Sequence, residues 1–143
     1  MHTIAAFADL LPGQEIPPLQ MTVDTATLVR YAGASDDYAP QHWDHKLMTG
    51  QGFPGVVVHG WLTFAYMCQA VTNWLPREIA DITHFSVRYH RPTFPGLVLC
   101  GGKVAATRVE DDARLVDLQL WAKDGGGEVT TTATMTLAVF DAS

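Results

Sequence analysis

Asp37 and His42 are the residues of this chain whose types and spacing best fit acid–base chemistry. They lie five positions apart on either side of Pro40, and a proline keeps the residue before it, Ala39, out of the right-handed helical region. The chain must therefore turn or extend here, and a tight loop can bring both side chains together. A carboxylate and a neutral imidazole that share one water can orient it, remove its proton and return a proton elsewhere, which is general acid–base chemistry.

A second pair, His59 and Gly60, opens a long uncharged run. Backbone N–H groups at a helix start can stabilise an oxyanion, and a glycine there lets a ligand approach the backbone closely. In the competing interpretation, Gly60 only allows contact between a helix and a sheet. His59 could polarise a substrate, but we favour a structural role in which it caps or braces the loop through a backbone carbonyl.

A metal site is an alternative reading of the same region. His42-Trp43-Asp44 spells the His-x-Asp half of an iron site with two histidines and one carboxylate, and His59, His84 or His90 could supply the third ligand. Such short spacings often arise by chance, and the oxygenases that use this site need a larger barrel than 143 residues can form. We therefore predict no metal and no other cofactor, which a measurement of bound iron would test.

The first half of the chain must supply the elements that position these residues. The pattern predicts a short strand, a helix capped by Asp24 and stopped near Gly33, a helical turn, an irregular Gly/Pro passage and a long helix. Their expected ranges are 19–23, 24–33, 44–48, 50–55 and 60–74. The run 56–75 has no acid, lysine or arginine, and apolar residues surround its helix on nearly all sides, which predicts a buried helix.

The second half changes to the period and composition of strands, rich in Val, Thr, Leu and aromatic residues. Strands are expected over 82–90, 97–109, 114–123 and 128–140, which predicts an antiparallel meander of four long strands. With the early strand added, the fold class is α+β. One helix packs on a curled antiparallel sheet, in a single domain over residues 1–143.

Composition restricts the partners and the compartment. A net charge of −6 argues against nucleic acid or an anionic membrane surface as partner, and polar residues interrupt an apolar run that barely reaches the length of a membrane span. Cys68 and Cys100 suggest reduced, buried thiols. The first ten residues lack the basic start of a signal peptide. We therefore expect a cytoplasmic protein.

The stretch from Tyr31 to Gly60 also carries a family resemblance. It resembles the hydratase motif of MaoC-like, R-specific enoyl-CoA hydratases, and weaker similarity over 10–16 and 87–96 extends the match to essentially the whole chain. Asp36 stands where the family usually has Gly, and Ala39 where it usually has Asn. The matching residues are Tyr31, Ala32, Ser35, Asp37, Pro40, His42, Asp44, Gly52, Phe53, His59 and Gly60.

The resemblance implies a hot-dog fold, an antiparallel sheet wrapped around a long central helix, usually as a dimer. It implies reversible hydration of trans-2-enoyl thioesters of coenzyme A or an acyl-carrier protein to (3R)-3-hydroxyacyl thioesters. Asp37 and His42 would hold the water. Asp37, helped by His42, would take its proton, and His42 would return a proton to the α-carbon. The N–H of Gly60 would stabilise, by donating a hydrogen bond, the negative charge that develops on the thioester oxygen.

Five further residues are candidates for substrate binding. Phe53 and Trp61 are candidate walls of an apolar acyl slot, although ordinary core positions are the commoner role for such residues. Arg88 could meet phosphates of coenzyme A or an acyl-carrier protein, although a solvated surface charge is the favoured interpretation. Ser35 and His59 complete the set as members of the motif.

Two other functions stay open. The chain could be a non-catalytic subunit that pairs with an active hot-dog partner, which the departures at Asp36 and Ala39 favour. It could also be an acyl-CoA thioesterase, which shares the fold in the resemblance but would direct water at the thioester carbonyl. We expect a homodimer or a heterodimer with another hot-dog subunit.

Overall fold

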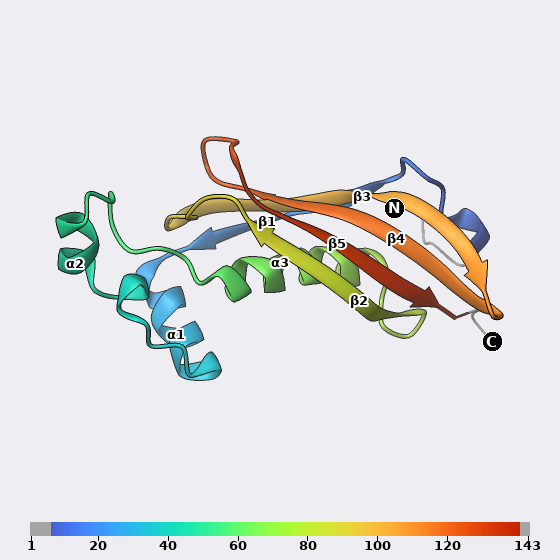
Figure 1. Ribbon diagram of the computed structural model, residues 1–143, viewed down its shortest axis with the longest axis horizontal. Helices are drawn as coiled ribbons and strands as arrows, with labels where there is room; N and C mark the ends of the chain where they lie inside the picture. Colours follow the sequence, from blue (N-terminus) through green and yellow to red (C-terminus); the bar gives the residue numbers. More distant parts are fainter. Residues whose placement is uncertain (1–6, 141–143) are drawn as a thin grey trace.

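The computed structural model describes residues 7–140 (Figure 1). Part of the N-terminal segment considered for an export signal therefore lies outside the described residues. In chain order the elements are a short 3-10 helix η1 (Phe7–Asp9), β1 (Glu15–Val23), α1 (Thr25–Ser35), a second 3-10 helix η2 (Pro40–His42), α2 (His45–Gly50), α3 (Gly60–Trp74), β2 (Ala80–Tyr89), β3 (Gly96–Glu110), β4 (Ala113–Lys123) and β5 (Val129–Val139).

The five strands form one antiparallel sheet in the order β1-β3-β4-β5-β2. The predicted meander is correct for β3, β4 and β5 but wrong for β2, which pairs with β5 instead of β3. The link after β2 contains Pro92 and Pro95, and its Thr93 carbonyl accepts a hydrogen bond from the Val58 N–H at 2.8 Å. Because this link pairs with another part of the chain, β2 and β3 cannot form a tight hairpin.

Strand alternation separates an inner face of the sheet from an outer face. On β4, Val116, Leu118 and Leu120 are buried against the core, whereas Gln119 is exposed and Trp121 is half-buried. The core between this inner face and α3 includes Leu62, Met67 and Val71 from the helix and Met135 and Leu137 from β5. The α+β prediction, a long helix packed on a curled antiparallel sheet, is therefore confirmed (Figure 1).

The prediction that α3 is buried on nearly all sides is wrong. Trp61, Ala65, Gln69 and Asn73 recur every four residues and are exposed, because the sheet covers only one side of the helix. Among residues 7–140, no helix combines the length and the apolar character that a bilayer crossing requires.

Both cysteines are free thiols among the residues that the structure describes. Cys100 is buried on β3, and burial raises its pKa to about 12. Cys68 on α3 is half-buried, and burial raises its pKa as well. Thiols with raised pKa values hold little thiolate at neutral pH, which suits a packing role.

The segment that carries the motif lies beyond one end of the sheet, where α3 begins (Figure 1). Asp24 caps α1 as predicted, because its side chain accepts a hydrogen bond from the Thr27 N–H at 2.7 Å. The helix passes through Gly33, where it was expected to stop, and ends two residues later at Ser35. Asp36, with a left-handed φ of 59°, then turns the chain.

Candidate active site

Asp37 and His42 lie next to each other, as the loop was expected to place them. Their closest atoms, Asp37 Oδ2 and His42 Nε2, are 3.7 Å apart. Ala39 is extended, with φ −56° and ψ 132°, and Pro40 then starts the single turn of η2 that carries His42. The imidazole is buried, whereas 42% of the Asp37 side chain is exposed. The pair therefore presents its carboxylate to solvent and keeps its imidazole in the protein.

The hydrogen-bond partner of Nδ1 decides which nitrogen of the His42 ring carries the hydrogen. Nδ1 lies 2.8 Å from the carbonyl oxygen of Val57. A carbonyl only accepts hydrogen bonds, so Nδ1 carries the hydrogen, and Nε2 of the neutral ring carries a lone pair. Nε2 and the Asp37 carboxylate are then both acceptors, at a separation too long for a direct hydrogen bond. A water molecule, with two O–H donors, matches this pair.

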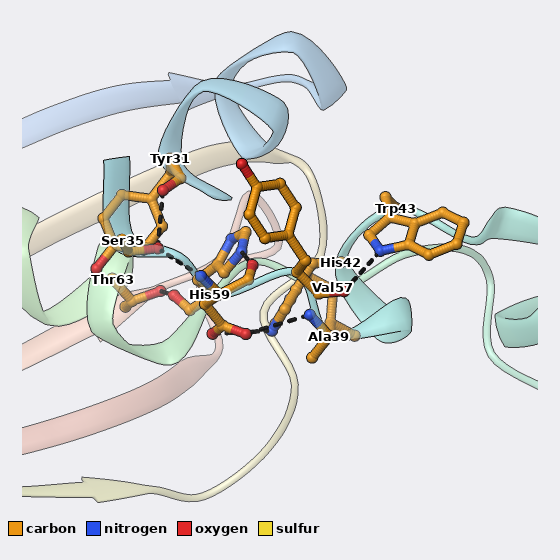
Figure 2. Close-up of polar contacts among 10 residues, drawn as sticks. Tyr31, Ser35, Ala39, His42, Trp43, Val57, His59 and Thr63 are labelled. Atoms are coloured by element: carbon orange, nitrogen blue, oxygen red, sulfur yellow. Dashed lines mark hydrogen bonds and ion pairs between the residues drawn. The ribbon is translucent and has the colours of Figure 1, made fainter. Parts of the chain in front are cut away.

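Hydrogen bonds hold the Asp37 residue from three directions, and their partners Ser35, Ala39 and His59 are labelled in Figure 2. Its N–H donates to the Ser35 hydroxyl at 3.3 Å, and its carbonyl oxygen lies 3.1 Å from His59 Nε2. Its Oδ1 accepts the Ala39 N–H at 3.3 Å. Oδ2 remains as the carboxylate oxygen that faces His42.

His59 braces the loop through a backbone carbonyl. Its ring is fully buried and stacks on His42 with centroids 3.8 Å apart and planes 18° apart, and Tyr31 packs edge-on against it at 4.9 Å. Nε2 must carry the hydrogen because it faces the carbonyl oxygen of Asp37. The remaining nitrogen, Nδ1, is buried and has no hydrogen-bond partner among the described residues.

Burial dominates the electrostatics of the groups around this pair. It lowers the pKa of His59, and the neighbouring His42 adds a smaller contribution in the same direction. It raises the pKa of Tyr31, and the Asp37 carboxylate adds to that shift. His59 is therefore held neutral and Tyr31 protonated near neutral pH.

Gly60 is the first residue of α3, and a Tyr89 ring from β2 lies against it. A Cβ on Gly60 would lie 2.9 Å from the ring carbons of Tyr89. The absent side chain thus permits close contact between the helix and the sheet, as in the packing interpretation of this glycine. The Gly60 N–H also belongs to the first helical turn, whose donors have no acceptor within the helix.

The other candidate residues lie at separate places. Ser35 contacts the site through its hydroxyl, which donates to the Tyr31 carbonyl at 2.8 Å and accepts from the Asp37 N–H. Phe53 follows α2 and lies near Phe94, with ring centroids 6.5 Å apart. Trp61 is 54% exposed and packs edge-on against Phe64. Of these three, Ser35 is the residue that shares a hydrogen bond with Asp37.

Arg88 lies on the outer face of the sheet. It lines a cavity of about 650 Å³ together with Ser86, Lys103, Gln119 and Trp121. Strand alternation directs its neighbours Val87 and Tyr89 to the inner face instead. The structure therefore does not bring Arg88 together with Asp37 and His42.

The metal-site alternative does not fit the positions of its ligands. The Asp44 side chain caps α2 by accepting the Leu47 N–H at 2.9 Å. Ligand atoms of Asp37, His42 and His59 do lie within 4.8 Å of one another. However, the two imidazoles are stacked, so an ion bound to both would lie far out of the plane of at least one ring. Their lone pairs do not converge on one ion.

Three contacts of the site, made by Val57, Tyr31 and Tyr89, were not predicted from the sequence. Val57 acts through its backbone carbonyl, which leaves no mark on the choice of side chain. Tyr31 was matched as a motif residue, but nothing indicated its contact with His59. The position of Tyr89 could have been predicted, because it is two and four positions from Val87 and Phe85 and therefore lies on the same face of the strand.

Fold and site together define a hot-dog protein that holds a carboxylate and an imidazole at the start of its central helix. Residues 8–134 match the family model of the MaoC like domain. The chain belongs to the MaoC-like dehydratase family. Comparison with curated protein sequences finds no match.

Solved structures similar to this chain have the hot-dog fold. The (R)-hydratase from A. caviae involved in PHA biosynthesis has a TM-score of 0.82 at 23% identity, over 92% of this chain and 98% of that one. The R-hydratase PhaJ1 from Pseudomonas aeruginosa has a TM-score of 0.85 at 19% identity, over 96% and 87%. The ChsH1-ChsH2 complex from Mycobacterium tuberculosis has a TM-score of 0.78 at 24% identity, over 91% and 98%.

Proposed function

We propose that this protein reversibly hydrates trans-2-enoyl thioesters of coenzyme A or an acyl-carrier protein to (3R)-3-hydroxyacyl thioesters. The observation that carries the proposal is the pair of acceptors, Asp37 Oδ2 and His42 Nε2, 3.7 Å apart. One water that donates a hydrogen bond to each acceptor has both hydrogens engaged, so its lone pairs point away from the pair and toward a substrate. Membership of a family that includes (R)-hydratases supports the reaction class.

The reaction adds one water and leaves the protein groups unchanged. As the water oxygen bonds to the β-carbon, Asp37 takes the released proton, and electron density moves through the α-carbon to the thioester oxygen. The N–H of Gly60 donates a hydrogen bond to this oxygen, and the loss of such a donor in comparable sites lowers the rate by about 10²–10³. The proton passes from Asp37 to His42 Nε2 and then to the α-carbon as the enolate collapses.

The two departures from the family motif leave the pair intact. Asp36 takes the left-handed conformation that glycine favours, at φ 59°. Ala39 supplies only its N–H, which donates to Asp37 Oδ1 at 3.3 Å. Neither departure displaces Asp37 or His42, so we favour an active enzyme over a non-catalytic subunit.

We further propose that the working form is a dimer with a copy of this chain or another hot-dog subunit. Within the described residues, β2 is an edge strand paired only to β5. Its Ile82 and Phe85 are exposed, and Trp61 of α3 packs against Phe85. An edge strand beside exposed apolar side chains is a surface that a second sheet can cover. Measuring the mass of the particle in solution tests this assembly.

Incubation of the purified protein with crotonyl-CoA tests the reaction. Loss of the enoyl absorbance without release of free thiol, with the (R)-3-hydroxy product on chiral analysis, is the expected result. Release of free thiol would instead identify a thioesterase. No change in either signal, including with a longer enoyl-CoA, would contradict activity and favour the partner-subunit function.

A further inference from the structure

One side chain touches both members of the Asp37–His42 pair. His59, the residue before α3, has its Nε2 3.1 Å from the Asp37 carbonyl oxygen. The same ring stacks on His42 with a centroid distance of 3.8 Å. Figure 2 shows the rings of His42 and His59 beside each other, although they come from different segments of the chain. No solvent reaches His59, so its position is set entirely by the protein.

We infer that His59 is the positioning residue of this pair. Its Nε2–H fixes the Asp37 peptide through the carbonyl oxygen, and its ring plane fixes the orientation of the His42 imidazole. The role rests on the proposed function where activity is the readout, but the hydrogen-bond pattern that it requires can be measured without any substrate.

The hydrogen bond matters because the other hydrogen bonds of the Asp37 residue are longer. The carboxylate is 42% exposed, and the residue's remaining hydrogen bonds, to the Ser35 hydroxyl and the Ala39 N–H, are both 3.3 Å long. Asp36, directly before it, is in a left-handed conformation. Without the donor from His59 the Asp37 peptide is free to rotate, and rotation changes the distance between its carboxylate and His42.

The second ring nitrogen keeps His59 out of the proton transfer. Nδ1 is buried without an acceptor among the described residues, so a proton placed there would lack a partner. The titratable groups that face the ring are Asp37, His42 and Tyr31. Burial lowers the pKa of His59, which agrees with a neutral ring. The proton released by the water therefore moves between Asp37 and His42 alone.

Three substitutions of His59 separate the effect of its hydrogen bond to Asp37 from the effect of its ring stacking on His42. His59→Gln places an N–H donor near the former Nε2 but removes the ring, and His59→Phe keeps a ring but removes the donor. His59→Asn has an amide like Gln that is too short to reach the Asp37 carbonyl. His84→Gln, on an exposed position of β2, is the matched control for loss of an imidazole elsewhere.

We expect His59→Phe and His59→Asn to lower kcat with crotonyl-CoA by about 100-fold with little change in KM, because misplacing a catalytic group by about 1 Å costs this much. His59→Gln is expected to retain activity within about tenfold, since it keeps the neutral hydrogen bond to Asp37 and removes only the stacking on His42. Thermal unfolding of each variant identifies any that fail to fold. If His59→Phe is one of them, the folded Gln and Asn variants still make the comparison.

Unchanged kcat in His59→Phe, or equal losses in folded Gln and Asn variants, would overturn the inference. Nitrogen NMR of the imidazoles provides the substrate-free arm at about pH 6, half a unit below the ordinary histidine value. A neutral His59 with its hydrogen on Nε2, and His42 with a hydrogen on Nδ1, are the expected signals. A hydrogen on Nδ1 of His59 would overturn the role. A wild-type protein without hydratase activity but with the expected signals would sink only the proposed function.

Discussion

The site end of the molecule and the body of its sheet are held together in different ways. In the sheet, β3 and β4 pair from Leu99 to Glu110 with one register shift, between Val104 and Ala106, so many equivalent backbone contacts hold the two strands together. At the site, each constraint occurs once, such as His42 on the Val57 carbonyl and His59 on the Asp37 carbonyl. A single substitution can therefore change the chemistry without unfolding the protein, and activity and stability become separable.

The largest expected effect is on activity at the site end. In the proposed reaction, Asp37→Asn removes the group that takes the proton from water, and His42→Ala removes its imidazole partner. Each is expected to lower kcat/KM for crotonyl-CoA by about 10²–10⁴, the usual contribution of a positioned acid or base. Steady-state kinetics with thermal unfolding measures both properties in the same samples.

Asp36→Asn is the matched control for this pair of variants, because it removes the neighbouring carboxylate and asparagine also tolerates a left-handed φ. It should retain nearly full activity and stability. Full activity in both Asp37→Asn and His42→Ala would show that the pair is not catalytic.

Two glycines sharpen the contrast between the regions. A Cβ on Gly102 of β3 would lie 2.4 Å from the backbone oxygen of Gln119, which cannot move without disturbing the sheet. Gly102→Ala should therefore lower the free energy of unfolding by about 1–3 kcal/mol or more. A Cβ on Gly60 would meet only the far end of the Tyr89 ring, which can swing aside, so Gly60→Ala should cost about 1 kcal/mol or less.

Urea unfolding of both variants checks this order. Equal losses of stability would contradict the view that the sheet is rigid at Gly102 and the helix start is adaptable at Gly60.

A pH dependence of stability is expected at the site end. Burial lowers the pKa of His59, so the folded protein binds a proton there less readily than the unfolded chain does. The stability due to the neutral ring is fully present above about pH 6.5, the ordinary value for histidine, and is lost as the pH falls below it. The urea concentration at the midpoint of unfolding should therefore decrease as the pH is lowered from about 7 to 5.

His59→Gln, which has no titratable ring, should show a shallower decrease over this range. His84→Gln serves as the control at an exposed position of β2 and should retain the wild-type slope. Parallel curves for wild type and His59→Gln would exclude His59 as the source of the dependence.

A small stabilising effect is expected at the opposite end of the sheet from α1 and α2 (Figure 1). Asp111 and Asp112 join β3 to β4 with left-handed φ values of 46° and 66°. Asn-Gly is the preferred pair for such a two-residue hairpin, so Asp111→Asn combined with Asp112→Gly should stabilise the protein by about 1 kcal/mol. Unchanged turnover of crotonyl-CoA relative to wild type, together with a higher thermal midpoint, is the expected outcome.

The sequence predicts the parts of the fold that depend on local patterns. The α3 helix begins at Gly60 and ends at Trp74 as expected, because a long apolar run has one dominant period. The pairing of β2 with β5 was not predictable, since strand partners depend on contacts such as that between Val58 and Thr93 that no local pattern records. The exposed side of α3 was missed for a similar reason, because a sheet that covers one side of the helix is a tertiary property.

In the candidate site, too, local features were predictable and tertiary contacts were not. The proximity of Asp37 and His42 followed from Pro40 and the short spacing, both of which are local. The stacking of His59 on His42 joins segments seventeen positions apart in the sequence, and the role of the Val57 carbonyl has no side-chain signature. Arg88 was grouped with the substrate contacts by resemblance, but its strand parity places it on the outer face.

Backbone carbonyl oxygens accept the three ring N–H hydrogen bonds that shape this loop. The donors are His59, Trp43 and His42, and the acceptors are Asp37, Tyr38 and Val57 respectively. An acceptor that belongs to the peptide is present whatever side chain that position carries. During evolution or in engineering, a change of the side chain at 37 therefore leaves all three hydrogen bonds available, and a change at 42 removes only the one to Val57. The chemistry of such a loop can therefore change, or be lost, while its shape is kept.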